Sequence, residues 1–383
     1  MSRPARPNYR HLGPFSDLVE AAKSASPLFP LAPPGEETRG SARAILGFRV
    51  GEERPGDPRL EHSWRADGVD GEEVSWSVGF GPRTHAWVLK PAGAEGPLPG
   101  VVALHDHSHF KFHGKEKIAD GPEGPLPALE PFRRTYYGGR GYANQLAREG
   151  FVVLAHDGFL FGSRKFPLDA MPDNDLRLAK AVEAVLEPEV STVGPDSYNG
   201  AAYSHEHVVS KYCALLGTSL SAVVAHDDRV ALNYLRARPD VDASRVACIG
   251  LSGGGLRSAL MRATSDHLTA CAIVGMMSTY DELLDGCVAP HTWMLFPAAW
   301  SRHGDWPDLA ACAAPAPLLV QYALDDPLFT VAGMRAADAR IAAHYGGVGA
   351  KEAYRREFHP GPHRFDVPMQ QNAMSWLKAQ LRV

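Results

Sequence analysis

The feature that most constrains the fold of this chain is a repeated change of hydrophobic period. Uninterrupted apolar runs at 100–106 (GVVALHD), 151–157 (FVVLAHD) and 245–250 (RVACIG) are typical of strands buried on both faces. Segments with helical periodicity lie between them, such as YGGRGYANQLAREG and SLSAVVAHDDRVALNYLRARPD. TACAIVGM, PLLVQYA and YRREFHP continue as strands, and QQNAMSWLKAQL is expected to form a last helix. This alternation predicts the α/β class, with a mostly parallel, doubly wound sheet.

The segments outside the alternation define the domain organisation. Residues 1–58 are rich in proline and glycine, with one short helical pattern (FSDLVEAAKSA), and predict an arm on the outside of the molecule or against another subunit. From residue 59, alternating apolar and polar residues predict antiparallel strands ahead of the parallel ones. We therefore expect one domain over 59–383, with insertions at about 159–218 and 277–313. Both insertions follow strands, so we expect them to form a cap or pocket wall at the carboxyl edge of the sheet.

Charge and composition argue against several classes of partner. The 383 residues carry a net charge of −5 without a basic cluster, so we expect no binding of nucleic acid. No apolar run approaches the ~20 residues of a membrane span, and the N-terminus lacks an apolar signal segment. We therefore expect a cytoplasmic protein that has no membrane partner. The five cysteines are widely spaced and never form C-x-x-C, which argues against a cysteine-based zinc site or a redox dithiol.

One pentapeptide carries the strongest chemical signal. RVACIGLSGGGLRSAL contains G-x-S-x-G over 250–254, with a buried strand before it and a helix after it. This context is that of a nucleophile elbow, in which a sharp turn exposes the serine, here Ser252. The serine would lie at the helix N-terminus, where the dipole and free N–H groups stabilise a developing oxyanion. The alternative, a phosphate-binding loop, lacks the G-K-[ST] ending.

A nucleophilic serine needs a base and an acid, which this kind of fold supplies after later strands in the order Ser, Asp, His. PLLVQYALDDPLF ends in two aspartates, of which Asp326 is the preferred acid and Asp325 the alternative. REFHPGPHRFDVP contains two histidines. We prefer His363 as the base, because His359 is still part of the expected strand.

The motifs taken together resemble a known family. GVVALHDH…GKEK, FVVLAHDGFLFGSR, RPDVDASRVACIGLSGGG and APAPLLVQYALDD, in this order, are similar to α/β-hydrolases, and more narrowly to bacterial dienelactone-hydrolase-like and acetyl-xylan-esterase-like enzymes. The resemblance covers roughly residues 60–383 and implies a carboxylic ester hydrolase with a Ser-His-Asp triad and no cofactor. The chain departs from the pattern in having Ser252 where true dienelactone hydrolases have cysteine. Ser108 and His109 follow HDH where the family usually has Gly-Gly.

The remaining site residues follow from motif position. The backbone N–H groups of Gly253 and His107 are expected to form the oxyanion hole. The insertions are expected to line the acyl and alcohol pockets of a small-molecule ester. The candidate substrate-binding residues are His291, Trp293 and Phe296, with Arg164 and Tyr203 as weaker candidates.

Alternatives to a serine esterase stay open at this point. The same triad chemistry serves amides, thioesters or carbon–carbon bonds, and the fold also suits an acyltransferase or a non-catalytic binder. The four histidines of ALHDHSHFKFHGKEK are also compatible with a metal-dependent hydrolase. The stretch lacks the H-x-H-x-D-H pattern, however, so we expect no metal. The chain should turn after Asp106, which leaves His107, His109 and His113 as pocket walls and His105 at the strand end. The N-terminal arm is a possible homodimer contact.

Overall fold

The computed structural model of the chain describes residues 9–48, 53–177, 181 and 196–383. Its strands form a nine-stranded sheet in the order β1-β2-β3-β5-β4-β6-β7-β8-β9. The first three strands pair antiparallel, β3 pairs antiparallel with β5, and every pair from β5 to β9 is parallel. The strands are β1 Gly56–Ala66, β2 Val69–Ser77, β3 Thr84–Pro91, β4 Leu98–Leu104, β5 Val152–His156, β6 Val241–Leu251, β7 Ala270–Val274, β8 Leu318–Ala323 and β9 Tyr354–His359.

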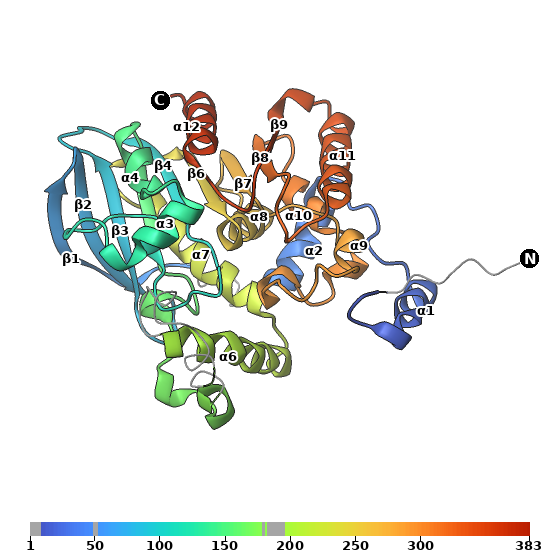
Figure 1. Ribbon diagram of the computed structural model, residues 1–383. Coiled ribbons are helices and arrows are strands. Elements are labelled where there is room, and N and C mark those ends of the chain that lie inside the picture. The colour runs from blue at the N-terminus through green and yellow to red at the C-terminus, as the bar shows by residue number, and fades with distance from the viewer. Residues whose placement is uncertain (1–8, 49–52, 178–180, 182–195) are drawn as a thin grey trace, which may run out of the picture.

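Helices cover both faces of this sheet (Figure 1). Along β4, Val101 and Ala103 belong to the core cluster under α4 and α12, whereas Val102 and Leu104 belong to the larger cluster under α2, α7 and α8. Both faces being buried explains the continuous apolar runs. The helices are α1 Asp17–Ala25, α2 Glu36–Leu46, α3 Glu130–Tyr136, α4 Tyr142–Arg148, α6 Asp196–Leu215, α7 Leu220–Arg236, α8 Gly253–Thr264, α9 Tyr280–Leu283, α10 Trp306–Ala311, α11 Val331–Gly347 and α12 Val367–Leu381.

The α/β class and the mixed sheet predicted from the sequence are confirmed, and this architecture is the α/β-hydrolase fold. The register brings the carboxyl ends of the parallel strands level. Leu104 pairs with Gly250, Leu251 with Val274, and Ala323 with His359. The loops that follow β4, β6, β7, β8 and β9 therefore emerge at one edge, where a doubly wound sheet places its ligand site.

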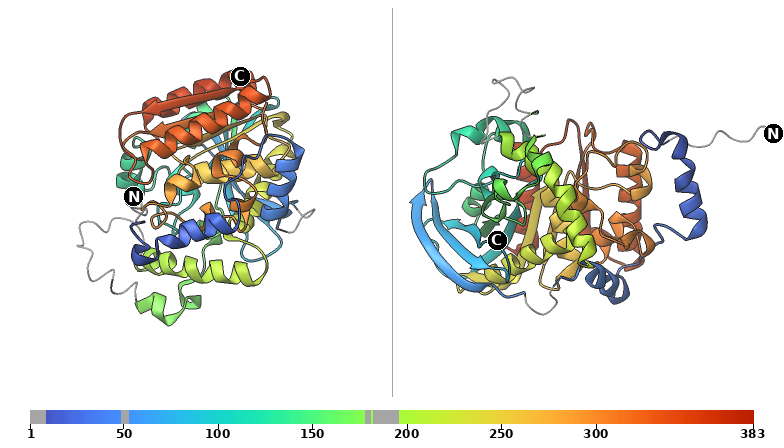
Figure 2. Two further views of the ribbon diagram at one scale, coloured as in Figure 1. Left: turned by 90° about the vertical axis from the view of Figure 1, so that its right-hand side faces the viewer. Right: turned by 90° about the horizontal axis from the view of Figure 1, so that it is seen from below.

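The N-terminal segment 1–58 contains one helix buried in the domain core and one helix outside it. Ala42 and Leu46 of α2 are fully buried in the larger core cluster, so this helix is part of the domain core rather than of an external arm. In contrast, α1 lies to one side of the body (Figures 1 and 2), and Phe15 and Leu18 expose 72% and 60% of their surface. Lys23 of α1 pairs with Asp281 at 2.6 Å. Only the α1 part fits the expected arm.

The two expected insertions contain helices and 3₁₀ turns. The first, at 159–218, holds the 3₁₀ turns Gly162–Arg164 and Leu168–Ala170 and then α6, while 178–180 and 182–195 lie outside the described residues. The second, at 277–313, holds α9, the turns Trp293–Leu295 and Trp300–Arg302, and α10. In the described ranges, no single helix is long and apolar enough to cross a membrane; the bent pair Tyr198–Leu215 and Leu220–Arg236 passes only by length and composition.

Candidate active site

Ser252 lies in a sharp turn between β6 and α8. Its backbone has φ 56° and ψ −120°, an unusual conformation for a residue with a side chain. Close approach of the flanking chain requires the glycines. A Cβ at Gly250 would lie 2.5 Å from the carbonyl carbon of Gly254, and a Cβ at Gly254 would lie 2.2 Å from the oxygen of Leu104. This strand–turn–helix geometry is that of a nucleophile elbow.

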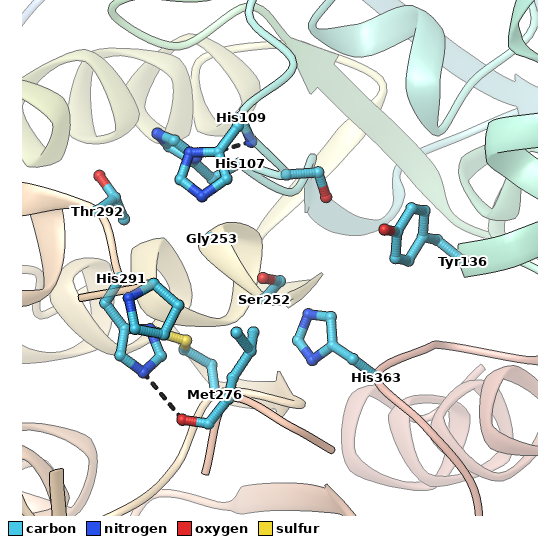
Figure 3. A pocket seen from close by; sticks show the side chains of 12 residues that line it. His107, His109, Tyr136, Ser252, Gly253, Met276, His291, Thr292 and His363 are labelled. Atoms are coloured by element: carbon cyan, nitrogen blue, oxygen red, sulfur yellow. Dashed lines mark hydrogen bonds between the residues drawn. The ribbon is translucent and has the colours of Figure 1, made fainter. Parts of the chain in front are cut away.

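His363 and Asp326 approach each other beside this turn. Asp326 follows β8, His363 follows β9, and the His363 Nδ1 lies 2.5 Å from an Asp326 carboxylate oxygen. The Leu328 N–H donates to the other oxygen at 2.9 Å and fixes the carboxylate. The His363 Nε2 is buried and has no hydrogen-bond partner within the described part of the chain. Figure 3 shows this ring beside Ser252.

The two alternative residues have other partners. The Asp325 carboxylate accepts the Gly361 N–H at 2.7 Å, and the His359 Nε2 lies 3.1 Å from Glu357. Both contacts hold the loop after β9 rather than the pocket. The structure therefore brings together Ser252, His363 and Asp326, the set preferred from the sequence.

The backbone of His107 lies against Gly253. A Cβ at 253 would lie 2.6 Å from the His107 nitrogen, so the first residue of α8 and the loop after β4 are in close contact. The His107 N–H has no backbone acceptor among the described residues, and the N–H of Gly253, at the first position of a helix, has no partner within that helix. Two N–H groups beside a serine are the arrangement of an oxyanion hole.

The side chain of His107 points away from this chemistry. Its Nδ1 accepts the His109 N–H at 3.1 Å, and its Nε2 lies 2.7 Å from the Glu206 carboxylate, so the proton is on Nε2. Burial lowers the pKa of His107 despite the attraction of Glu206, and the ring is neutral. Ser108 and His109 have positive φ angles of 44° and 51°. These are conformations that Gly-Gly would adopt without strain.

Glu206, on α6, connects three segments of the site wall. Its carboxylate lies 2.6 Å from the Lys111 ammonium and accepts from the Thr292 hydroxyl at 2.6 Å and the Trp293 N–H at 3.0 Å. Burial would raise the pKa of Glu206, but the attraction of His107 and Lys111 and their hydrogen bonds outweigh it and lower the pKa. No sequence pattern pointed to this residue. The signal available was a glutamate between His205 and His207 on a helix.

A cavity of about 170 Å³ lies at Ser252. Ser252, Gly253, His107 and His363 meet there, and His109, Tyr136, Met276, His291, Thr292 and Leu328 complete most of the wall (Figure 3). Burial lowers the pKa values of His109 and His291 to about 4. The wall therefore carries no histidine charge from these two rings near neutral pH.

The predicted substrate-binding residues fall in different places. His291 lines the cavity, and its Nε2 lies 3.2 Å from the Leu328 oxygen. Tyr203 contacts the His109 ring at 4.8 Å, and Trp293, 45% exposed, donates its indole N–H to His207 at 2.8 Å. Both lie beside the wall rather than in it.

Two of these candidates lie away from the cavity. Phe296 faces a separate apolar cavity with Phe29 and Tyr280. Arg164 is buried in an ion pair with Asp227 at 3.0 Å. The reason is packing: the aromatic run 291–300 bends back into the core after Trp293, and a buried arginine requires a carboxylate partner.

The four histidines that suggested a metal site have separate partners. His105 lies beside Gly158 and Phe161, and His107 binds Glu206. His109 contacts Tyr203, and His113 packs between Phe110 and Phe112. Within the described residues, no group of three histidine, cysteine, aspartate or glutamate side chains is arranged to hold a metal ion.

Comparisons with known proteins agree with the fold. No protein-family model matches the chain. Among curated proteins, "Putative hydrolase YtaP" of Bacillus subtilis (strain 168) is 24% identical over 273 residues, which cover 70% of this chain and 74% of that protein. Among solved structures, a "putative acetyl xylan esterase" from Bacteroides fragilis NCTC 9343 superposes with a TM-score of 0.61 at 15% identity, over 84% of this chain and 73% of that one. A glucuronoyl esterase from Solibacter usitatus superposes with a TM-score of 0.56 at 16% identity, over 99% and 98%.

Proposed function

We propose that this protein is a serine hydrolase that cleaves a carboxylic ester through an acyl-enzyme. The observation that carries the proposal is the convergence of three strand ends: Ser252 in an elbow after β6, Asp326 after β8 and His363 after β9. Two further points support it: the pocket lies at this serine, and structures with esterase names share the fold.

In the proposed mechanism, His363 accepts the proton of Ser252 as the hydroxyl oxygen attacks the ester carbonyl. Asp326 holds the ring with Nδ1 protonated and stabilises the imidazolium. The N–H groups of Gly253 and His107 bind the oxyanion, and loss of one such donor typically costs about 3 kcal/mol in the barrier. As the tetrahedral intermediate collapses to the acyl-enzyme, His363 gives this proton to the departing alcohol. His363 then activates water, whose attack releases the carboxylic acid and restores Ser252. This reaction uses only groups of the chain, without a cofactor or metal.

The pocket suits an uncharged acyl group. The cavity at Ser252 has a volume of about 170 Å³. The pKa values of about 4 for His109 and His291 leave both rings neutral at pH 7, so they offer no charge to an acidic acyl chain. We therefore propose uncharged acyl esters as the first substrates to assay.

A Ser252→Ala variant tests the proposal directly. We expect turnover of a short-chain aryl ester to fall by at least about 10³-fold, because the nucleophile is lost. A serine-directed fluorophosphonate should label the wild type and not the variant, as intact-protein mass spectrometry will show. Turnover that survives Ser252→Ala but is abolished by a chelator would contradict the serine mechanism and favour a metal-dependent hydrolase.

The adjacent aspartates provide a matched pair for the acid. Asp326→Asn removes the carboxylate beside His363 Nδ1 and should lower kcat by about 10³–10⁴-fold. Asp325→Asn changes a carboxylate that accepts the Gly361 N–H outside the pocket, and kcat should stay within about threefold of wild type. Steady-state kinetics on folded samples decide the assignment, and the reverse order of effects would transfer the role to Asp325.

A further inference from the structure

Lys117 is a fully buried lysine that the proposed mechanism does not use. It lies in the 3₁₀ turn Lys115–Lys117, and its ammonium donates to the backbone oxygens of Asp106 at 2.9 Å and His107 at 3.2 Å. The Asp106 carboxylate is 3.4 Å away. Burying an ammonium costs free energy unless each of its three protons has a hydrogen-bond acceptor. The two backbone oxygens and the carboxylate supply these acceptors and fix the lysine in one position.

The peptide between Asp106 and His107 connects this cation to the candidate oxyanion hole. Its carbonyl oxygen accepts from Lys117 and also from the Nδ1 of His105, at 2.9 Å each. Its N–H is that of His107, whose nitrogen lies against Gly253. In a planar trans peptide the C=O and N–H point in opposite directions, so the donors and the pocket lie on opposite sides of one amide.

Hydrogen bonds to a carbonyl polarise the amide and strengthen the donor at its N–H. A charged donor has about twice the effect of a neutral one. We propose that Lys117 is a positioning residue that holds and polarises the Asp106–His107 peptide, so that the His107 N–H binds the oxyanion of the reaction. This inference rests on the proposed function and adds to it a group that never touches the substrate.

The surroundings of Lys117 define its charge state. The Tyr137 hydroxyl donates to the Asp106 carboxylate at 2.5 Å, and the Phe110, Phe132 and Phe161 rings surround the ammonium at 4.9–5.7 Å. The Arg257 guanidinium on α8 repels it, and Glu116 of its own turn attracts it. Burial outweighs the attraction of Asp106 and lowers the pKa of Lys117 to about 8. Its deprotonation therefore falls within an accessible assay range, whereas an arginine there would stay charged.

Three variants test the inference on a short-chain aryl ester between pH 6 and pH 10. Lys117→Met should lower kcat about 10–100-fold with little change in KM, because the substrate is bound as before while the oxyanion is not. Lys117→Arg should keep part of kcat and move the alkaline decline, expected near pH 8 in the wild type, upward by more than one pH unit. Lys115→Met is the matched control: it removes a buried cation of the same turn, paired with Asp157 at 3.1 Å, that touches neither carbonyl. Its kcat should stay within about threefold.

The outcomes separate this inference from the proposed function. If Ser252→Ala retains turnover, the serine mechanism itself fails. If Ser252→Ala is inactive but folded Lys117→Met keeps kcat within twofold, only the role of Lys117 is overturned. An alkaline decline at the same pH in wild type and Lys117→Arg also overturns it. If Lys117→Met does not fold, Lys117→Met with Asp106→Asn removes both charges, and the same loss of kcat is then expected.

Discussion

At the residue scale, Glu206 gives the ring of His107 a protein partner and fixes the loop that carries the four histidines. The glutamate binds the His107 ring at 2.7 Å and the Lys111 ammonium at 2.6 Å, and it also fixes Thr292. The histidine ring thus serves as a tether for the loop, and its backbone remains free to face Gly253. A buried carboxylate with four partners holds the histidine loop, α6 and the 291–293 segment in one arrangement.

We expect Glu206→Gln to destabilise the protein by about 3–5 kcal/mol, because the buried Lys111 cation loses its counter-charge. Urea unfolding at pH 7 measures this change, and kcat should fall as the loop loses its tether. Glu206→Gln combined with Lys111→Met removes both charges and should recover part of the stability. Equal stability of wild type and the single variant would show that the cluster does not hold the wall.

At the element scale, α2 is a core helix whose burial was not predicted from the sequence. EETRGSARAIL follows a proline-rich segment and contains few apolar residues, so it reads as part of an arm. Two of those apolar residues, Ala42 and Leu46, lie four apart on one helix face and are fully buried. The rest of the helix is anchored by surface pairs such as Arg43 with Asp266.

Leu46→Ala should lower the free energy of unfolding by about 2–5 kcal/mol, since it leaves a cavity in the main core. Arg43→Ala on the same helix is the control and should cost less than about 1 kcal/mol, because its ion pairs are exposed. Thermal unfolding of both variants gives the comparison. Equal, small effects would mean that α2 is detachable from the domain.

At the scale of the whole molecule, the candidate catalytic groups and the exposed apolar side chains of the N-terminal segment lie on different parts of the fold. The strand ends bring the candidate site to one edge of the sheet, whereas α1 lies outside the body (Figure 2). Leu18 of α1 and Phe15, in the turn just before it, are exposed. Exposed large apolar side chains on a projecting helix are typical of an interface. The homodimer contact expected from the sequence therefore remains a prediction for α1 alone.

If α1 forms a dimer contact, Phe15→Glu with Leu18→Glu should shift the sedimentation coefficient from dimer to monomer, because charge would be buried in the interface. Leu215→Glu with Leu216→Glu provides the control, since these side chains at the end of α6 are 85% and 76% exposed. Analytical ultracentrifugation of the three proteins decides the matter. A monomeric wild type, or dissociation by the α6 pair only, contradicts the expectation.

The parts of this fold that depend on local hydrophobic periodicity could be predicted from the sequence. Continuous apolar runs identified the buried strands, and the residues directly after them included Ser252 and Asp326, because a strand end fixes where the next residues emerge. Helix α2 was not identified, because its apolar face is only a few residues wide. Trp293 and Phe296 could not be placed, since nothing local fixes the direction in which a long insertion returns to the core.

By itself, the sequence determined the class of fold, the succession of strands along the chain and the residues at their ends. Hydrophobic period is a property of neighbouring residues, and Ser252, Asp326 and His363 each follow a strand. The tertiary structure alone decided which buried charges meet. Glu206 is 99 residues from His107, and the carbonyl that Lys117 binds in the Asp106–His107 peptide is 11 residues earlier. Such contacts depend on where distant loops meet in the fold, and no local sequence pattern predicts those meeting points.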